Sequence, residues 1–349
     1  MTLLVTAMGD AHLHAVVDLT LTQEARQRAR DPHLRAARTR QQIEGALAMQ
    51  RSRSDEQPLV ALDARERVRG YARSSVWELA EASMLRAFLS ARSGVARHLA
   101  LPDPTDEDAH AVAAALFSAL SDSWRAHATT GDLVRWPSAD PWLEPRLVEQ
   151  GFRLDSVCAT RSLQPLPEVL HAPSPQLVIR PAQPADEEVL IVLFEEELRY
   201  HERYTPFVRS SPEVLAAFRR KLARLWAGAS LSEGAPLILV VERAGEIVAM
   251  AENTLLVLGF DDEPGFTPPG RYGCIDNVSV REELRGQGIG RLLTQAIFDA
   301  FAATGLHLDG YILWYNPDNP QAGRFWPRMG FHPLWTTYQR LHHTASGTG

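Results

Sequence analysis

The sequence is poor in cysteine and in long apolar runs, and each scarcity excludes a class of protein. Its 349 residues include only two cysteines, Cys158 and Cys274, too few for a disulfide framework or a thiolate metal site. We therefore expect both to be buried small hydrophobic residues, and we expect no metal. No apolar run approaches the ~20 residues of a membrane helix, and the N-terminus MTLLVTAMGDAH lacks the basic start and long apolar stretch of a signal peptide. A cytoplasmic protein without a membrane partner is the default expectation.

Lysine is almost absent, because Lys221 is the only one in the chain. A phosphate-binding loop of the nucleotide-triphosphatase kind needs a lysine after its last glycine, and none lies near residue 290. The formal net charge is −7 and no lysine- or arginine-rich block occurs, so the electrostatic field of a general nucleic-acid-binding protein is missing. We expect no nucleic-acid partner. With 45% hydrophobic and 23% charged residues, the chain has the composition of a globular protein and the length of two domains.

Prolines and apolar residues organise the chain. Residues 164–176, QPLPEVLHAPSPQ, hold four prolines, which favour extended backbone and exclude a helix, so we interpret this stretch as an interdomain linker. Beyond it, apolar periodicity predicts a short strand, two amphipathic helices and three strands within 235–280. One apolar stripe over 291–305 predicts a further helix. A strand at 311–315 and a short helix that Gly330 ends complete this half.

The stretch LRGQGIGRLL, residues 284–293, places three glycines at alternate positions between Arg285 and Arg291. It lies between a predicted strand and a predicted helix, where backbone N–H groups can turn inward and the helix dipole favours an anion. The two arginines add charge suited to phosphate. For the glycines alone, a tight turn without a ligand stays an open alternative. A dinucleotide-binding fingerprint fits poorly, because G-x-G-x-x-G counted from Gly286 ends on an arginine.

Two motifs resemble those of the GCN5-related N-acetyltransferase (GNAT) superfamily. VSVREELRGQGIGRLL is similar to its acetyl-CoA signature, a valine-rich strand followed by R/Q-x-x-G-x-G/A, here Arg285, Gly288 and Gly290. NPDNPQAGRFWPRMGF is similar to its N-x-x-A-x-x-F/Y-Y-x-x-x-G-F element, here Asn319, Ala322, Phe325, Gly330 and Phe331. The resemblance covers roughly residues 176–342. It implies an α/β fold with a mixed sheet that splays after its fourth strand.

The resemblance also implies a coenzyme site and a reaction. Acetyl-CoA would be the co-substrate, and an amine would attack its thioester directly in a ternary complex. An amide near Val278 would act as oxyanion donor, and the glycine loop would hold the pyrophosphate. The coenzyme contacts that this implies are Val278, Ser279, Val280, Arg285, Gly286, Gln287, Gly288, Ile289, Gly290, Arg291, Asn319 and Phe325.

The group that protonates the leaving thiolate departs from the family's pattern. Many members place a tyrosine directly after the position of Phe325, whereas this chain has Trp326, and an indole is no useful proton donor. Tyr315, Tyr311 or Tyr338 are the alternatives within the chain. A thiolate with a parent pKa near ~8.5 can also take its proton from water.

The general base has two candidates, Asp276 on the strand that leads into the glycine loop and Glu252 on the neighbouring predicted strand. Asp276 is equally well explained as a hydrogen-bonding residue at a strand end. Cys274 as an acyl-carrying nucleophile is a further alternative, without an adjacent activating group. The first two helices of this half would supply acceptor contacts that favour a cationic amine, although a solvated helix face explains most of them: Glu195, Glu196, Glu197, Tyr200, His201, Glu202 and Tyr204.

The first half resembles a second copy of the same fold. Residues 131–152 align with residues 310–331 under a shift of 179 residues without a gap, and a period this long indicates duplicated domains. The same shift places the glycine loop on DEDAHA, Asp106 to Ala111. Three carboxylates there would each repel a pyrophosphate by about 1 kcal/mol, more than the ~0.3–1 kcal/mol that a helix end contributes. We therefore predict a degenerate copy that does not bind acetyl-CoA in the usual way.

Together these observations predict a degenerate GNAT-like domain over 1–163, the linker 164–176, a catalytic GNAT domain over 177–342 and a flexible tail over 343–349. The chain would be a monomer with pseudo-dimeric tandem domains or a homodimer. Its predicted function is acetyl transfer to a primary amine of a small molecule. A non-catalytic acetyl-CoA-binding module and a protein or peptide N-acetyltransferase are the alternatives. The tandem arrangement resembles the mycothiol synthase type, whose acceptor is a sugar-linked cysteine amine; this rests on architecture alone.

Overall fold

The computed structural model describes residues 3–51, 56–166, 177–260, 262 and 265–342. The first half contains β1 (Leu4–Ala7), α1 (Leu13–Arg30), α2 (Arg40–Arg51), β2 (Glu56–Leu62), β3 (Val68–Glu78), β4 (Arg92–Ala100), α3 (Ala109–Ala126), β5 (Gly131–Pro137), α4 (Glu144–Glu149) and β6 (Arg153–Arg161). The second half contains β7 (Leu177–Pro181), α5 (Glu187–His201), α6 (Pro212–Trp226), β8 (Leu237–Arg243), β9 (Glu246–Leu258), β10 (Gly270–Val280), α7 (Ile289–Ala303), β11 (Gly310–Tyr315), α8 (Ala322–Arg328) and β12 (His332–Leu341).

The two halves repeat one order of elements, β-α-α-β-β-β-α-β-α-β. Strands β5 and β11 begin at Gly131 and Gly310, and β6 and β12 begin at Arg153 and His332, so both pairs keep the shift of 179 residues. The predicted fold class, two tandem copies of a mixed α/β fold, is confirmed. The strand that ends each copy, β6 or β12, was not among the elements predicted from the sequence.

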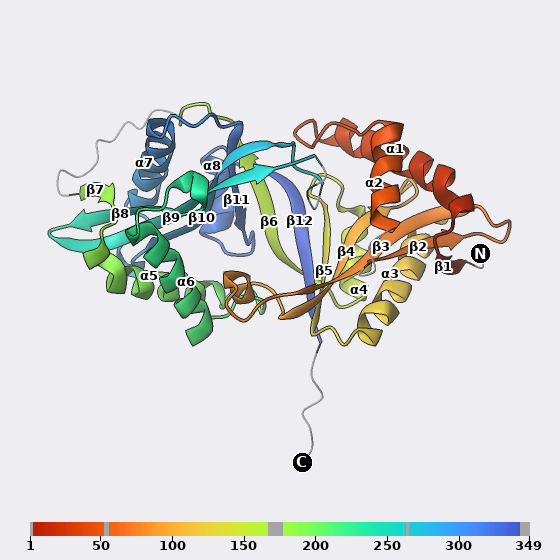
Figure 1. Ribbon diagram of the computed structural model, residues 1–349, viewed down its shortest axis with the longest axis horizontal. Coiled ribbons are helices and arrows are strands. Elements are labelled where there is room, and N and C mark those ends of the chain that lie inside the picture. Colours follow the sequence, from red (N-terminus) through yellow and green to blue (C-terminus); the bar gives the residue numbers. More distant parts are fainter. Residues whose placement is uncertain (1–2, 52–55, 167–176, 261, 263–264, 343–349) are drawn as a thin grey trace, which may run out of the picture.

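All strands of the described residues join one sheet, in the order β1-β2-β3-β4-β5-β12-β6-β11-β10-β9-β8-β7. Exchanging the two halves in this order reverses it, which indicates an approximate two-fold axis between β12 and β6. Figure 1 shows the same relation, since α1 and α2 lie above the sheet in one half while α5 and α6 lie below it in the other. The halves are therefore arranged like the subunits of a dimer.

The last strand of each half pairs with strands of the other half. β12 pairs with β5 over Trp335–Leu341, and β6 pairs with β11 over Val157–Arg161. β6 and β12 also pair with each other and run side by side through the middle of the molecule (Figure 1). A boundary drawn between residues 163 and 177 therefore does not separate two independent sheets. Residues 167–176 of the expected linker and the expected tail 343–349 lie outside the described residues.

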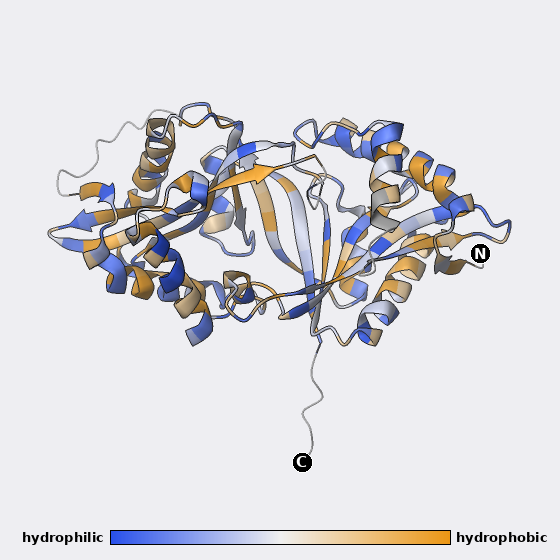
Figure 2. Ribbon diagram, viewed as in Figure 1, coloured by the Kyte–Doolittle hydropathy of each residue, from blue (hydrophilic) through white to orange (hydrophobic). Residues whose placement is uncertain are grey.

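Apolar stripes on the helices pack against this sheet. On α7, Leu293, Ile297 and Phe301 recur every four residues and are fully buried, as the helical period requires. Figure 2 shows the resulting alternation of hydrophobic and hydrophilic segments along the flanking helices. Both cysteines are buried, as predicted, and burial raises the pKa of the Cys158 and Cys274 thiols. None of the helices in the described ranges has the length and apolar content of a membrane span.

The exchange of β6 and β12 predicts that neither half folds alone. Residues 1–166 and 177–349, expressed separately, should each expose an unpaired edge strand and lack part of their core, so they should aggregate or show no cooperative thermal transition. Produced together, they should co-purify as a one-to-one complex, measured by size-exclusion chromatography and circular dichroism. A monomeric half that unfolds cooperatively would contradict this.

Candidate active site

The second half contains a cleft where two neighbouring strands part. β10 and β11 pair in parallel only from Tyr272 and Gly310 to Ile275 and Leu313. β10 continues beyond this point and pairs with β9 as far as Val280. Its far end is therefore hydrogen-bonded on one edge by β9, while the strand that flanks its other edge has diverged. This is the splay that the family resemblance implies.

The cleft has a volume of about 540 Å³. Three structural groups line it: the end of β10 with the loop into α7, the end of β11 with α8, and one face of α5. The lining side chains and backbone come from Glu197, Tyr200, His201, Ile275, Asp276, Val278, Ser279, Val280, Leu284, Arg285, Gly286, Gly288, Ile289, Gly290, Arg291, Trp314, Tyr315, Asn319, Pro320, Gln321, Ala322, Arg324, Phe325, Trp326, Arg328 and Met329. All the predicted coenzyme contacts lie on this wall except Gln287.

The glycine loop reaches the cleft through two left-handed residues. Gly286 has φ 77° and Gly288, the N-cap residue of α7, has φ 86°. L-residues with side chains rarely adopt these values, so glycine is required at both positions. Gly290 has no such constraint, and a Cβ there would meet the Phe325 ring at an ordinary 3.5 Å. The first turn of α7 lines the cleft, and first-turn N–H groups are available for an anion.

Arg285 places a positive charge on the cleft wall beside the glycine loop. Its Nε donates to the carbonyl of Val280 at 2.9 Å, and its guanidinium carbon lies 4.1 Å from the centre of the Tyr200 ring. These contacts orient the side chain. Its Nη1 is buried and has no hydrogen-bond partner within the described residues. A partly buried guanidinium with a buried, vacant donor favours an anionic ligand.

The second motif builds the opposite wall. Asn319 is 2% exposed, and its Oδ1 accepts hydrogen bonds from the backbone N–H groups of Gln321 at 3.0 Å and Ala322 at 3.4 Å, which starts α8. Phe325 and Trp326 follow on the cleft side, with their rings edge to face and 4.8 Å apart between centroids. Asn319 thus shapes the turn, and the aromatic pair forms an apolar surface.

Asp276 lies on a β-bulge that opens toward the cleft. The register of β10 against β9 shifts between Ile275 and Asn277, and bulges beside active sites re-aim a side chain in this way. Asp276 is exposed and lines the cleft. Its Oδ2 accepts from the Thr254 hydroxyl at 2.7 Å, and its Oδ1 accepts from the Cys274 thiol at 3.3 Å. The carboxylate is therefore oriented by two donors while still reaching solvent.

Glu252 lies behind the wall of the cleft. It is 0% exposed, forms an ion pair with Lys221 and accepts from Asn277 Nδ2 at 2.7 Å. Burial raises the pKa of Glu252, and Lys221 offsets part of that rise. Burial alone would lower the pKa of Lys221, but the carboxylates of Glu252 and Asp276 outweigh it and raise that pKa, which keeps the ammonium charged. This burial argues against direct proton transfer by Glu252, and we assign it to the support of the site.

Of the three tyrosines considered for the general acid, Tyr315 alone lines the cleft. Tyr311 stacks on Phe298 at 4.1 Å, and Tyr338 lies in the core of the first half. Burial raises the pKa of Tyr315, so its phenol is protonated at neutral pH and can donate. Cys274 fits a nucleophile poorly, since burial and the neighbouring Asp276 raise the pKa of its thiol.

The acceptor side is formed by Glu197, Tyr200 and His201 of α5, which line the cleft together. Their spacing of three and four residues places them on one helix face, a signal that could have selected them from the seven candidates. Glu197 Oε1 lies 3.6 Å from His201 Nε2, while Glu197 Oε2 is buried with no hydrogen-bond partner in the described ranges. An unsatisfied buried carboxylate oxygen favours a cationic or N–H-bearing ligand.

The remaining acids of α5 are used elsewhere. Glu195 accepts from Arg199 at 2.7 Å, and Glu196 lies 3.7 Å from Arg281. Trp314 and two arginines of α8, Arg324 and Arg328, also line the cleft. The sequence did not identify these three residues, because none of them occupies a signature position of either motif. The cleft therefore has an acidic side on α5 and basic residues around the glycine loop and α8.

The corresponding position in the first half is occupied by its own acids. α3 begins at Ala109 with Asp108 as N-cap residue, and Arg69 Nη2 donates to Asp108 Oδ1 at 2.8 Å. Arg26 Nη1 lies 3.5 Å from Asp103. The helix start at the equivalent position thus carries the Asp108 carboxylate in an internal ion pair, and the loop before it carries that of Asp103.

Comparison with known proteins agrees with this arrangement. Residues 194–331 match the model of the "Acetyltransferase (GNAT) family", which confirms the resemblance carried by the two motifs. No curated protein matches the chain.

Several solved structures resemble the whole chain. A GCN5-related N-acetyltransferase from Sphaerobacter thermophilus has a TM-score of 0.53 at 17% identity, covering 97% of this chain and 95% of that chain. A tandem GNAT protein from the clavulanic acid biosynthesis pathway has a TM-score of 0.47 at 15% identity, covering 97% and 98%. At such low identity, the Sphaerobacter thermophilus structure shows a shared fold and nothing more. That shared fold extends over almost the entire chain, the first half included.

The buried charges behind the cleft predict a specific stability effect. Lys221→Met should lower the free energy of unfolding by about 3 kcal/mol or more, because it leaves a buried carboxylate without its counterion. The double variant Lys221→Met/Glu252→Gln should recover most of this loss, since no buried charge remains at Glu252. Urea denaturation measures both. Equal destabilisation by the single and double variants would contradict the buried pair.

Proposed function

We propose that this chain, whose residues 194–331 form a domain of the acetyltransferase (GNAT) family, is an acetyl-CoA-dependent N-acetyltransferase acting on a primary amine of a small molecule. One observation carries the proposal: an anion-accepting helix start, an unpaired strand edge and an acidic helix face line a single cleft. Each meets one part of the reaction, namely the pyrophosphate, the pantetheine arm and the amine.

The coenzyme is proposed to lie along the opening between β10 and β11. The pyrophosphate would meet the first turn of α7, the vacant Nη1 of Arg285 and the charge of Arg291. The pantetheine amides would pair with the backbone of Val278–Val280, whose other edge is already bonded to β9. The N–H near Val278 would then face the thioester carbonyl as oxyanion donor.

The acceptor is proposed to enter from the side of α5. Glu197 and Asp276, both on the cleft wall, would attract an ammonium group, and the buried Glu197 Oε2 would accept one of its N–H bonds. A cleft of about 540 Å³ falls within the ~300–1,000 Å³ of small-molecule sites. Part of that space must hold the thioester arm, which favours a small amine over a folded protein substrate.

The reaction would then proceed by direct attack. The ammonium loses a proton to Asp276, directly or through water, because attack requires a free electron pair on nitrogen. The amine nitrogen bonds to the acetyl carbon, and the thioester C–S bond breaks. Coenzyme A leaves as a thiolate, and the new amide nitrogen loses its second proton to water. The thiolate takes a proton from water, or from Tyr315, which then regains one from water. Thr254 and Lys221 hold the Asp276 carboxylate in place during this sequence.

Two alternatives stay open, a non-catalytic acetyl-CoA-binding module and a protein or peptide N-acetyltransferase. Incubation with acetyl-CoA, a panel of amines and a thiol-reactive dye separates them. The panel should include simple amines, a sugar-linked cysteine amine and peptides with free N-termini. Thiol release with small amines supports the proposal. Release only with peptides would favour the second alternative, and binding without release across the panel would favour the first.

The coenzyme loop has a matched control in the other half. Gly290→Glu places a carboxylate on the cleft wall without a backbone clash, and Ala111→Glu places one at the exposed position that the shift of 179 residues makes equivalent. We expect Gly290→Glu to weaken acetyl-CoA binding by at least about 10-fold through repulsion of the pyrophosphate, measured by calorimetry. Ala111→Glu should bind like the parent chain. Ala109, the position equivalent to Gly288, is unsuitable for a control variant because its side chain is buried. Equal losses in the two variants would exclude a single coenzyme site.

The base assignment predicts a split between catalysis and binding. Asp276→Asn keeps the shape of the side chain and removes its capacity to take a proton, so kcat should fall roughly 100-fold or more at neutral pH. The affinity for acetyl-CoA, measured by calorimetry, should be retained. If kcat and its pH profile matched those of the parent chain, Asp276 would have a structural role only.

A further inference from the structure

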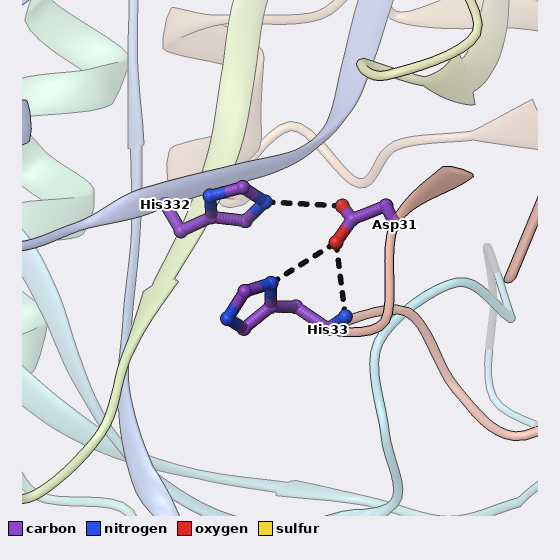
Figure 3. Close-up of side chains that lie close together, drawn as sticks. All are labelled: Asp31, His33 and His332. Atoms are coloured by element: carbon purple, nitrogen blue, oxygen red, sulfur yellow. Dashed lines mark hydrogen bonds and ion pairs between the residues drawn. The ribbon is translucent and has the colours of Figure 1, made fainter. Parts of the chain in front are cut away.

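Away from the cleft, three potential metal ligands from the two halves converge. Asp31 follows α1, His33 lies two residues later, and His332 is the first residue of β12 (Figure 3). Asp31 Oδ1 lies 3.0 Å from His33 Nδ1, and Asp31 Oδ2 lies 3.1 Å from His332 Nε2. The two imidazole rings lie 4.2 Å apart between centroids. One buried carboxylate thus receives a ring nitrogen from each side.

The ligand atoms match the preferences of transition metals. One atom from each residue lies within 4.8 Å of the other two, and no other group of three or more His, Cys, Asp or Glu residues in the described ranges meets this condition. Two imidazole nitrogens and one carboxylate oxygen are ligands of Zn²⁺, Ni²⁺, Cu²⁺ and Fe²⁺ rather than of Mg²⁺ or Ca²⁺. Each ring nitrogen that faces Asp31 now donates its proton to the carboxylate. A divalent cation would replace these protons and lie between the two nitrogens and the carboxylate, with each imidazole in its other tautomer.

The surroundings of Asp31 prepare this arrangement. Asp31 is 2% exposed, and its Oδ1 also accepts from the His33 backbone N–H at 2.9 Å, which fixes the carboxylate before any ion arrives. The His33 and His332 side chains are 60% and 45% exposed. They can therefore make the small shift that ~2.0–2.1 Å bonds require. The open side also leaves room for water as a further ligand.

We propose that Asp31, His33 and His332 bind one divalent transition-metal ion of the Zn²⁺ class, and that the ion links the two halves of the chain. Asp31 and His332 are 301 residues apart in sequence and belong to different copies of the fold. None of the three residues lines the acetyl-CoA cleft. A bound ion would stabilise the folded chain by linkage, because the ligand set does not exist in the unfolded state.

The test uses the full chain without a histidine tag. Calorimetry with ZnCl₂ at neutral pH should show one ion per chain, MgCl₂ should show no binding, and CoCl₂ should give the visible absorption of low-coordinate Co²⁺. At a hundredfold excess over Kd, Zn²⁺ should raise Tm by about 4 °C.

Matched variants locate the site. His332→Gln and His33→Gln keep an amide that can donate to Asp31 but remove an imidazole, so each should weaken Zn²⁺ binding at least 10-fold while Tm without metal and acetyl-CoA affinity are retained. His307→Ala is the control, since His307 is exposed and lies away from the three ligands, with its Nε2 3.8 Å from Asp309 Oδ1; it should bind Zn²⁺ like the parent chain. Two results would overturn the proposal. One is the absence of Zn²⁺ binding at about 100 μM, which is a hundredfold excess over a micromolar Kd. The other is binding that survives the double His33→Gln/His332→Gln substitution.

Discussion

The exchange of β6 and β12 is the constraint on which the rest of the structure depends. Val157 and Ala159 of β6 lie in the core of the second half, and Tyr338 of β12 lies in the core of the first. The outer edge of β11 is bonded by β6. This allows β11 to diverge from β10 without leaving a second unpaired edge. The cleft of one half is therefore held open by a strand of the other.

This dependence gives the degenerate copy a physical reason to persist. The first half also reaches the acceptor side, because Asp155 of β6 accepts from the Thr205 hydroxyl at 3.3 Å, just beyond the end of α5. Asp155 is buried, and burial raises its pKa. A copy that has lost its glycine loop can still complete the sheet and support the helix that faces the proposed acceptor. Loss of the anion site thus need not entail loss of the fold.

Electrostatics divides the two copies more sharply than shape does. Both place a helix start after the fourth strand of their half, at Ala109 and Ile289. One start is preceded by Asp108, which is paired with Arg69, and the other by left-handed Gly288 beside Arg285. The same backbone plan therefore presents a carboxylate paired with an arginine at one helix start and a glycine turn beside an arginine at the other.

Prediction from sequence succeeded where the signal is local. The glycine loop combines turn chemistry and a helix start within ten residues, so its place in the fold followed from neighbours in the chain. Gln287 is not part of the cleft wall, and its Oε1 accepts from Arg243 Nη1 at 3.4 Å, so its contact with the coenzyme stays a prediction. The sequence pattern could not distinguish Glu197, whose Oε2 is buried beside the cleft, from Glu195, which is paired with Arg199.

The tandem α/β fold could be predicted from the sequence and is confirmed, since it rests on a repeat and on the spacing of nearby residues. The degenerate first copy and the coenzyme loop rest on the same kind of pattern and stay predictions. Tertiary structure alone decided the exchange of β6 and β12, the burial of Glu252 against Lys221, and the meeting of Asp31 with His332. Those features join residues from distant parts of the chain or of a sheet. Which distant partners meet is set by strand order and packing, and local residue patterns do not carry that information.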